Sequence, residues 1–181
     1  CSINTKANIG SNNGRKLQDN QKIEVSKIKE LRRRKLDHIN SKIENIRVIK
    51  GTNFHYFSKE SQDKFFKKEY SVTKLTDRMG MRLEGERLDN IVNTNIKSEG
   101  LVKGVIQIPA DGNPIIMLAD HGTIGGYPKI ATVISADLDK LSQLTPGSKI
   151  KFKEVNLKDA ETIFKLYEME TNNIISKILW I

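Results

Sequence analysis

The sequence predicts a mainly β protein with peripheral helices, of the closed-barrel type. Three observations predict this class: about seven short segments have β-type patterning, two of them read as a hairpin, and few segments have helical periodicity. A chain of 181 residues is long enough for one ordinary domain with a full core.

The first predicted elements precede the hairpin. Apolar residues at helical spacing predict an amphipathic helix over residues 26–46, and residues 47–49 follow as a strand. Ser58 is a suitable N-cap for a short helix with acidic residues in its first turn and two phenylalanines on its inner face. Residues 70–73 are rich in β-formers, and residues 81–84 alternate as a strand with one polar face.

The hairpin is the clearest local signal. Residues 105–108 and 115–118 are apolar runs of strand length, and the sequence Ala-Asp-Gly-Asn-Pro at 110–114 predicts a tight turn between them. Further strands are predicted over residues 130–134 and 150–155. These strands complete a set that suits an antiparallel barrel.

Helical segments lie between and after the last strands. Residues 137–144 predict a short helix that Pro146-Gly147 stops. Residues 157–181 carry apolar side chains at helical spacing, capped by Asn156, and predict one or two helices broken near Asn172-Asn173. We therefore expect a barrel domain over residues 46–156 and a helical segment over 157–181 whose apolar stripe packs on it.

Composition limits the compartment and the partners. No apolar run approaches the roughly 18 to 20 residues that cross a bilayer, and the first residues contain no signal-peptide core. Cys1 is the single cysteine and cannot form an internal disulfide. We expect a cytoplasmic protein with no membrane partner.

The net charge of +9 and the run Arg32-Arg33-Arg34-Lys35 would suit a nucleic-acid partner. However, aromatic residues are few, and none interleaves the basic run to stack on bases. We expect no specific nucleic-acid partner.

Polar residues concentrate around the hairpin, and two of them are candidate catalytic residues. Asp120 follows an apolar strand, so we expect it to be partly buried; its carboxylate could hold an amide N–H, act as a base if its pKa is tuned, or cap a turn. Gln107, on the neighbouring strand, could donate to a carbonyl and accept from an N–H, or join two strands.

The segment that follows Asp120 contains four candidate substrate-binding residues: Gly125, Gly126, Tyr127 and Lys129. Gly125 and Gly126 suit positive φ angles, close approach to a ligand and backbone N–H groups aimed at an oxyanion, or a structural turn. Tyr127 and Lys129 could donate hydrogen bonds or neutralise a carboxylate or phosphate. Their alternatives are a packed tyrosine and a solvated lysine.

Arg78 and Arg82 form a second candidate binding group, since two guanidinium groups suit a carboxylate or phosphate. The alternative for Arg82 is a surface pair with Glu84. The sequence lacks a P-loop, a G-x-S-x-G elbow and the cysteine and histidine spacing of a zinc site, so we expect no metal.

The motifs around the hairpin carry a family resemblance. Residues 104–131 follow the pattern G-x-I-Q-V-P-x-D-G-x-P-I-x-L-x-A-D-x-x-T-x-G-G-Y-P-K-I-A closely. Residues 77–85 are similar to S-D-R-M-G-Y-R-L-E-G, and residues 98–100 match S-E-G. In these motifs the chain resembles the biotin-dependent carboxyltransferase family (carboxyltransferase domain, subdomain A and B; allophanate hydrolase subunit 2-like). That family contains the C subunit of bacterial 5-oxoprolinase and the carboxyltransferase part of urea carboxylase.

The resemblance implies a cyclophilin-like barrel and an activity. Within the family, the chain most resembles the C subunit of 5-oxoprolinase. That resemblance implies ATP-dependent hydrolysis of 5-oxoproline to glutamate together with the A and B subunits. It also implies that the ATP site is shared with a partner subunit. Asp120 and Gln107 would position the amide, while the glycine turn, Tyr127 and Lys129 would stabilise developing charge. The alternatives are biotin-dependent carboxyl transfer to an amide such as urea, with biotin as cofactor, or a non-catalytic regulatory or truncated remnant.

The resemblance also covers less than a whole family member. Residues 1–45 resemble the remnant of a preceding subdomain and a linker, and the N-terminal half of the family domain is an expected partner. Where the family shows Arg-Gln, this chain has His121-Gly122, which removes a cation beside the expected site.

Overall fold

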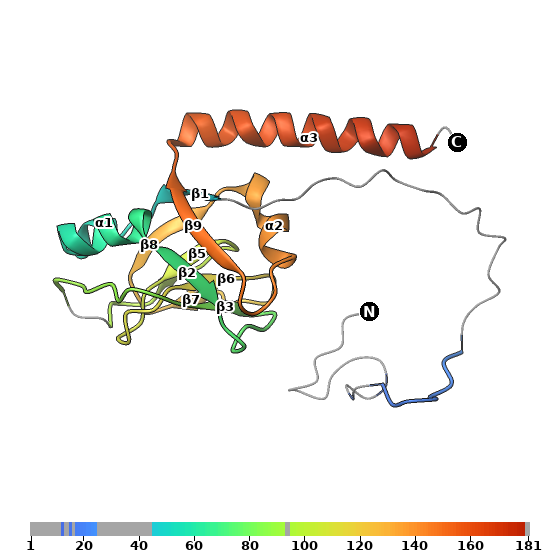
Figure 1. Ribbon diagram of the computed structural model, residues 1–181, viewed down its shortest axis with the longest axis horizontal. Coiled ribbons are helices and arrows are strands. Elements are labelled where there is room, and N and C mark those ends of the chain that lie inside the picture. Colours follow the sequence, from blue (N-terminus) through green and yellow to red (C-terminus); the bar gives the residue numbers. More distant parts are fainter. Residues whose placement is uncertain (1–11, 13–14, 16, 25–44, 93–94, 180–181) are drawn as a thin grey trace. The chain divides into compact units, whose positions relative to one another are not determined.

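Seven strands close into a barrel in this computed structural model, shown in Figure 1. The structure describes residues 12, 15, 17–24, 45–92 and 95–179. Contacts divide the chain into residues 1–35 and residues 36–181, and the barrel belongs to the second unit. Residues 25–44, most of the helix predicted over 26–46, lie outside the described residues, as does most of the predicted remnant at 1–45; Ile46, at the predicted end of that helix, belongs instead to a strand.

The strand order around the barrel is β1-β8-β5-β6-β3-β2-β9. The strands are β1 (Ile46–Lys50), β2 (Glu69–Val72), β3 (Gly80–Glu84), β5 (Val105–Gln107), β6 (Ile115–Met117), β8 (Lys129–Val133) and β9 (Lys149–Glu154). The predicted mainly β fold, a closed barrel with helices outside it, is confirmed. One feature differs from the antiparallel expectation, because β1 and β9 pair in parallel. No local sequence pattern predicts this parallel pairing, because about a hundred residues separate the two strands.

Large side chains from several elements fill the barrel. Inward-facing positions alternate with exposed ones along β3 and β9, as the pleat of a strand requires. Phe65 stacks on Phe152 with ring centroids 4.5 Å apart, and Tyr70 lies beside both rings. Phe65 comes from α1 (Lys59–Lys67), which packs on β9. The predicted N-cap is confirmed, because the Ser58 hydroxyl accepts a hydrogen bond from the Ser61 N–H at 3.2 Å.

The β5–β6 hairpin forms as predicted, with Gln107 opposite Ile115 at its turn end. In the turn, the Gly112 N–H donates to the Pro109 carbonyl at 3.0 Å, and Gly112 has φ of +75°. Glycine takes up this left-handed conformation without steric cost. The local turn signal was therefore sufficient to place the hairpin.

A second, two-stranded sheet was not predicted. It consists of β4 (Glu99–Gly100) and β7 (Ile124–Gly125), which pair in antiparallel fashion. Strands of two residues leave no alternation to detect, and these two come from loops that are far apart in the sequence. This sheet holds Gly125, one of the predicted binding residues.

Helical elements follow β8. The predicted helix over 137–144 is a 3₁₀ turn, η3 (Ser135–Asp137), continued by the short helix α2 (Leu138–Ser142). Another 3₁₀ turn, η2 (Phe54–Tyr56), lies between β1 and α1.

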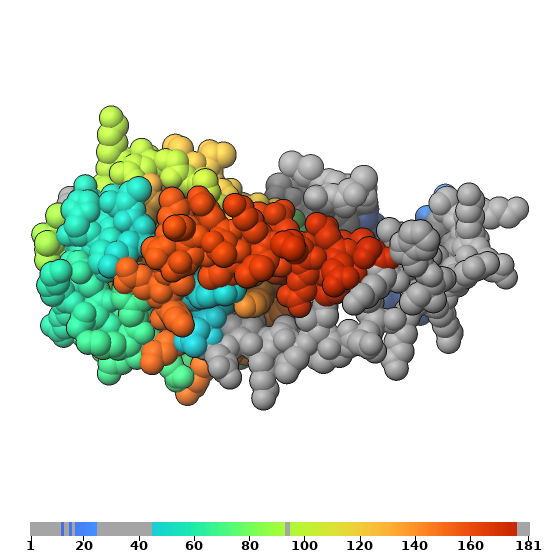
Figure 2. Space-filling model, turned by 90° about the horizontal axis from the view of Figure 1, so that it is seen from above, coloured from blue at the N-terminus to red at the C-terminus, as the bar shows by residue number. Residues whose placement is uncertain are grey.

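The C-terminal helix is continuous. α3 (Leu157–Leu179) runs without a break through Asn172 and Asn173, because asparagine disfavours a helix interior by less than about 1 kcal/mol and neither proline nor glycine is present. Asn156 caps it as predicted, accepting from the Asp159 N–H at 2.8 Å. Figure 2, seen from above Figure 1, shows α3 lying across the near face of the molecule.

The predicted apolar stripe of α3 packs only in part. A small cluster joins the helix to the barrel side that carries η3, formed by Ile134, Ala136 and Ala160 with Ile49, Val155, Ile163, Phe164 and Tyr167 around them. Leu157 and Ile175, also predicted to pack, are exposed. Among the described residues, no helix has both the length and the apolar character that crossing a lipid bilayer requires.

Candidate functional site

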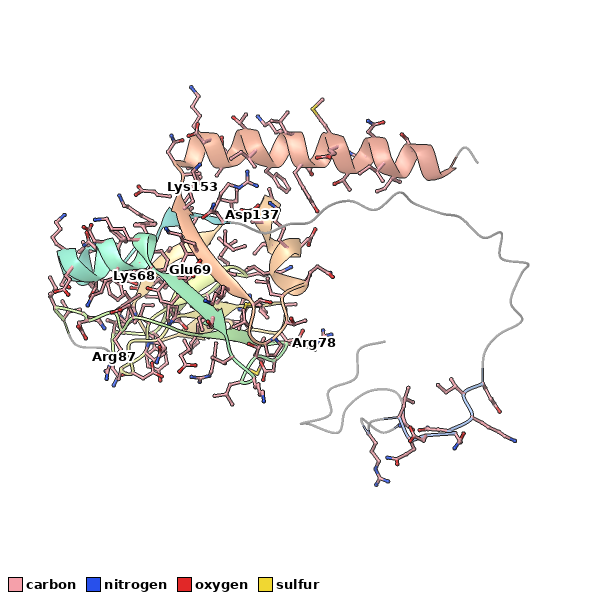
Figure 3. All side chains as sticks on the ribbon, in the orientation of Figure 1. Lys68, Glu69, Arg78, Arg87, Asp137 and Lys153 are labelled. Carbon is pink, nitrogen blue, oxygen red and sulfur yellow. The ribbon has the colours of Figure 1, made fainter. Side chains whose placement is uncertain are left out.

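The predicted site residues divide between the two ends of the β5–β6 hairpin. Gln107 lies at the turn end, whereas Asp120 follows Met117 and lies beyond the opposite end. Figure 3 marks the two ends: Arg87 donates to the Ala110 carbonyl of the turn, and Arg78 binds Asp120 on the other side of the barrel. The structure thus does not bring the two predicted catalytic residues together.

At the end of the hairpin opposite its turn, Asp120 forms an ion pair with Arg78. Nε of Arg78 lies 2.5 Å from Oδ2, and Nη2 lies 3.1 Å from Oδ1, so the contact is bidentate. The Asp120 N–H also donates to the Arg78 carbonyl at 2.9 Å. The expectation that Asp120 is partly buried is wrong: its side chain is 46% exposed and that of Arg78 is 68% exposed. The reason is that β6 ends at Met117, so Asp120 lies in the following turn.

The turn before β3 directs Arg78 toward its partner. The Asp77 carboxylate accepts hydrogen bonds from the N–H groups of Met79 (2.8 Å) and Gly80 (3.2 Å). This Asx-type turn explains the local sequence Asp-Arg-Met-Gly, since a short acidic side chain replaces a backbone acceptor. Arg78 occupies its exposed corner.

The ion pair with Arg78 limits the ability of Asp120 to act as a base. The hydrogen bond from Arg78 holds the pKa of Asp120 below its usual range. Because a carboxylate with a lowered pKa is a weak proton acceptor at neutral pH, the geometry favours an N–H-accepting role over that of a general base.

At the turn end, the polar groups bind one another, and Gln107, Lys129 and Asn53 are buried. Lys129, whose side chain is 10% exposed, forms an ion pair with Glu99 and donates to the Gly100 carbonyl at 3.3 Å. Its backbone N–H donates to Oδ1 of Asn53 at 3.0 Å. The alternative of a solvated Lys129 is therefore wrong. The hydrogen bond from Lys129 also lowers the pKa of Glu99, with a smaller contribution from Asn53.

Gln107 belongs to the same buried cluster. Its Nε2 donates to the Tyr127 carbonyl at 2.9 Å, so it joins β5 to the segment that precedes β8. This is the strand-to-strand alternative for Gln107. We call Gln107, Lys129 and Asn53, together with the partly exposed Glu99 at their edge, the buried polar cluster.

The two glycines act through close packing rather than unusual φ. Neither Gly125 nor Gly126 has positive φ, so that part of the prediction is wrong. A Cβ on Gly125 would lie 2.8 Å from Nε2 of Gln107 and 2.8 Å from a methyl carbon of Leu101. The Gly126 carbonyl accepts from the Ile96 N–H at 2.9 Å. Glycine at 125 therefore lets β7 approach the buried polar cluster.

Two predicted binding residues lie apart from these contacts. The Tyr127 side chain is partly exposed beside the buried polar cluster. Arg82 projects from the outer face of β3 and makes no ion pair with any residue that the structure describes, Glu84 included.

Sequence reasoning missed Glu99 and Asn53. The S-E-G match drew attention to Glu99 without a role, and its position beside Lys129 depends on the unpredicted β4–β7 sheet. Asn53 is 76 residues from the N–H that it accepts from, and no local signal could have found it. Within the described ranges, no group of three or more His, Cys, Asp or Glu side chains is arranged to hold a metal ion.

Comparison with known proteins supplies the family context. The family described as "Carboxyltransferase domain, subdomain A and B" matches residues 1–154. The C subunit of 5-oxoprolinase from Escherichia coli (strain K12) is 35% identical over 88% of this chain and 52% of its own length. That of Haemophilus influenzae is 34% identical over 96% of this chain and 56% of its own. The chain thus spans about half the length of these relatives.

A solved structure agrees with this grouping. The urea carboxylase of Kluyveromyces lactis matches with a TM-score of 0.69 and 25% identity, covering 76% of this chain and 13% of that protein. The barrel, its motifs and the extent of the family match lead to one conclusion. The chain belongs to the carboxyltransferase domain, subdomain A and B, family.

Proposed function

We propose that this chain is the counterpart of the C subunit in an ATP-dependent 5-oxoprolinase, which hydrolyses 5-oxoproline to glutamate together with the A and B subunits. The observation that carries the proposal is the identity of 34 to 35% to two proteins named as the C subunit of 5-oxoprolinase, over most of this chain. Partners that supply the remaining functions are part of the proposal, as is a cytoplasmic location.

The Arg78–Asp120 pair suits the polar groups of 5-oxoproline. This substrate has one carboxylate, one lactam N–H and one lactam carbonyl. Both side chains are exposed, so the substrate carboxylate could replace Asp120 on the Arg78 guanidinium. The released Asp120 carboxylate, which is ionised at neutral pH as an ordinary exposed aspartate is, would then accept the lactam N–H. Arg82, on the solvent face of β3, stays a proposed additional contact to the carboxylate.

The turn end has a positioning role in this proposal. Gln107 and Lys129 already bind groups of this chain, and they hold the 125–127 segment against β5 and β4. That segment presents the exposed Tyr127 to solvent at the turn end, away from the Arg78–Asp120 pair, so Tyr127 has no direct role toward a lactam bound at that pair. Gly125 and Gly126 support this placement by close packing, since a Cβ on Gly125 would meet Gln107 and a Cβ on Gly126 would meet the Ile96 carbonyl.

ATP would supply the activation of the lactam carbonyl by phosphoryl transfer, and hydrolysis of the ring C–N bond would then give glutamate. We propose that ATP binds at an interface with another protein of the complex, because this sequence contains no P-loop. The residues of this chain would orient the lactam for that activation.

Reconstitution tests the proposal. The purified A and B subunits would be assayed for 5-oxoproline-dependent ATP hydrolysis and glutamate release, with and without this chain, after circular dichroism has shown that it is folded. We expect stimulation by the wild-type chain and little or none by Asp120→Asn of equal stability. Full stimulation by Asp120→Asn would remove Asp120 from the mechanism.

The structural likeness to urea carboxylase favours a second candidate, carboxyl transfer from carboxybiotin to an amide such as urea. The same amide-binding groups would serve it. A biotin-carrier partner and incorporation of labelled bicarbonate into urea would identify this reaction. A folded chain that binds the B protein of 5-oxoprolinase but supports neither reaction would be a regulatory or truncated family member.

A further inference from the structure

A pocket lies beside the Arg78–Asp120 pair, between the start of β3, the end of β6 and α2. Its volume is about 410 Å³. Its lining combines polar residues of the turn before β3 and of the loop before β5 with apolar residues of β3, of the segment after β6 and of the α2 region. This volume falls in the range of about 300 to 1,000 Å³ that small-molecule pockets occupy.

The inner wall is apolar. Met81 and Leu141 belong to the barrel core and are fully buried, and Leu118 packs against the same core. Leu138 and Leu144 continue this wall on the side of α2. Because 5-oxoproline offers only two ring methylene groups to such a wall, the wall indicates a ligand with a longer hydrocarbon part.

Two further donor groups, the Lys103 ammonium and the Thr76 hydroxyl, belong to residues that line the same pocket. Lys103 is exposed and makes no ion pair with any residue that the structure describes. The Thr76 hydroxyl oxygen is buried, and none of the described residues is its hydrogen-bond partner. Because an unpaired buried hydroxyl is unfavourable, a ligand oxygen that reached it would add to binding. Asp77, the acidic residue of the lining, accepts two N–H groups of its own turn.

We infer that this pocket binds a small amphipathic acid, a medium-chain aliphatic carboxylate in its simplest form. The hydrocarbon chain packs on Met81 and the leucines, while the carboxylate meets the exposed Lys103 and displaces side chains enough to reach the Thr76 hydroxyl. Arg78, paired with Asp120, belongs to the same lining. The inference is independent of the proposed 5-oxoprolinase reaction, since it concerns ligand binding by this chain alone.

Octanoate is the probe, and isothermal titration calorimetry on the intact chain is the measurement. We expect saturable binding of one octanoate per chain, and binding of the neutral analogue octanol about 5- to 10-fold weaker. Lys103→Ala should weaken octanoate binding by a similar factor without affecting octanol. The matched control is Lys153→Ala, an exposed lysine on β9 outside the pocket lining, which should bind octanoate as the wild type does.

Two further variants separate binding from folding. Ala119→Phe places a ring in the mouth from an incompletely buried position and should abolish binding while the melting temperature is unchanged. Thr76→Val should weaken octanoate binding and raise the melting temperature, because it removes a buried unpaired hydroxyl. No saturable binding of octanoate at millimolar concentration would overturn the inference. So would octanol binding as tightly as octanoate, or undiminished binding by a folded Ala119→Phe.

Discussion

Asp137 is a fully buried carboxylate with four donors around it. Arg47 donates from Nε at 2.9 Å, from Nη2 at 2.6 Å and from its backbone N–H at 2.9 Å, and Lys140 donates from Nζ at 2.9 Å. Burial alone would raise the pKa of Asp137, but the hydrogen bonds from Arg47 and Lys140 outweigh it and the pKa is lowered. Asp137 therefore links β1 to α2 as an ionised group.

We predict that Asp137→Asn lowers the free energy of unfolding by about 3 kcal/mol, because it leaves the Arg47 guanidinium without its counter-charge. Urea denaturation at pH 7 measures the change. Glu154→Gln is the control: it breaks a pair with Lys50 in which both side chains are 47% exposed. Exposed pairs contribute between about 0 and 1 kcal/mol, so an equal loss in both variants would contradict the structural role of Asp137.

The Asp137 carboxylate should also make the free energy of unfolding depend on pH. Since its folded-state pKa is lowered, the stabilisation is present above the unfolded value of about 3.9 and is lost as pH falls through the folded value. The difference in unfolding free energy between wild type and Asp137→Asn should therefore shrink below about pH 4. Urea denaturation in buffers from pH 7 to pH 3 checks this, and a constant difference would contradict it.

The close packing around Gly125 predicts that any side chain at this position is destabilising. Gly125→Ala would place a methyl group 2.8 Å from Gln107 Nε2, so we expect a loss of about 1 to 3 kcal/mol and displacement of the Gln107 amide from the Tyr127 carbonyl. Melting temperature and the Gln107 side-chain amide signals in NMR measure these two effects. The control is Gly100→Ala on the paired strand β4, because a Cβ there meets no atom within 4 Å. Equal effects of the two substitutions would argue against the packing account.

At this scale the sequence predicted residue types better than their contacts. It singled out Asp120 and Arg78 separately, and the structure joins them by two hydrogen bonds. It predicted positive φ for Gly125, where the requirement for glycine is instead the approach of Gln107. That approach links positions 18 residues apart through an unpredicted sheet, so no local pattern could reveal it.

At the scale of elements, the hairpin and the capped helices were predictable because their signals are local. The turn at 110–114 and the caps Ser58 and Asn156 all work through backbone groups only two or three residues away. The β4–β7 sheet is different, because each of its two-residue strands is defined only by its pairing with the other, which the local sequence does not show.

The α3 cap gives the prediction at this scale. Asn156→Ala should lower the stability of α3 by about 1 kcal/mol, because the Asp159 N–H loses its acceptor. Asn156→Ser keeps an acceptor at the same position and should retain most of the stability. Hydrogen exchange at Asp159 and Ala160 measures the effect, and equal protection in both variants would contradict the cap.

At the scale of the whole molecule, barrel closure separates the two predicted catalytic residues. Gln107 and Asp120 lie in one continuous motif of the sequence, which suggested a single constellation. The antiparallel hairpin instead sends Gln107 to one end and Asp120 to the other. Hydrophobic patterning predicts strands and a mainly β barrel, but strand order and the parallel β1–β9 closure depend on contacts distant in sequence.

The central proposal is that this chain performs the role of the C subunit in a 5-oxoprolinase. Its most direct test is glutamate release from 5-oxoproline and ATP by fixed amounts of the A and B subunits, titrated with this chain. We predict a rise that saturates near one copy of this chain per copy of the B protein and is lost without ATP. No glutamate release at any ratio, from a folded chain that binds the B protein, would contradict the proposal.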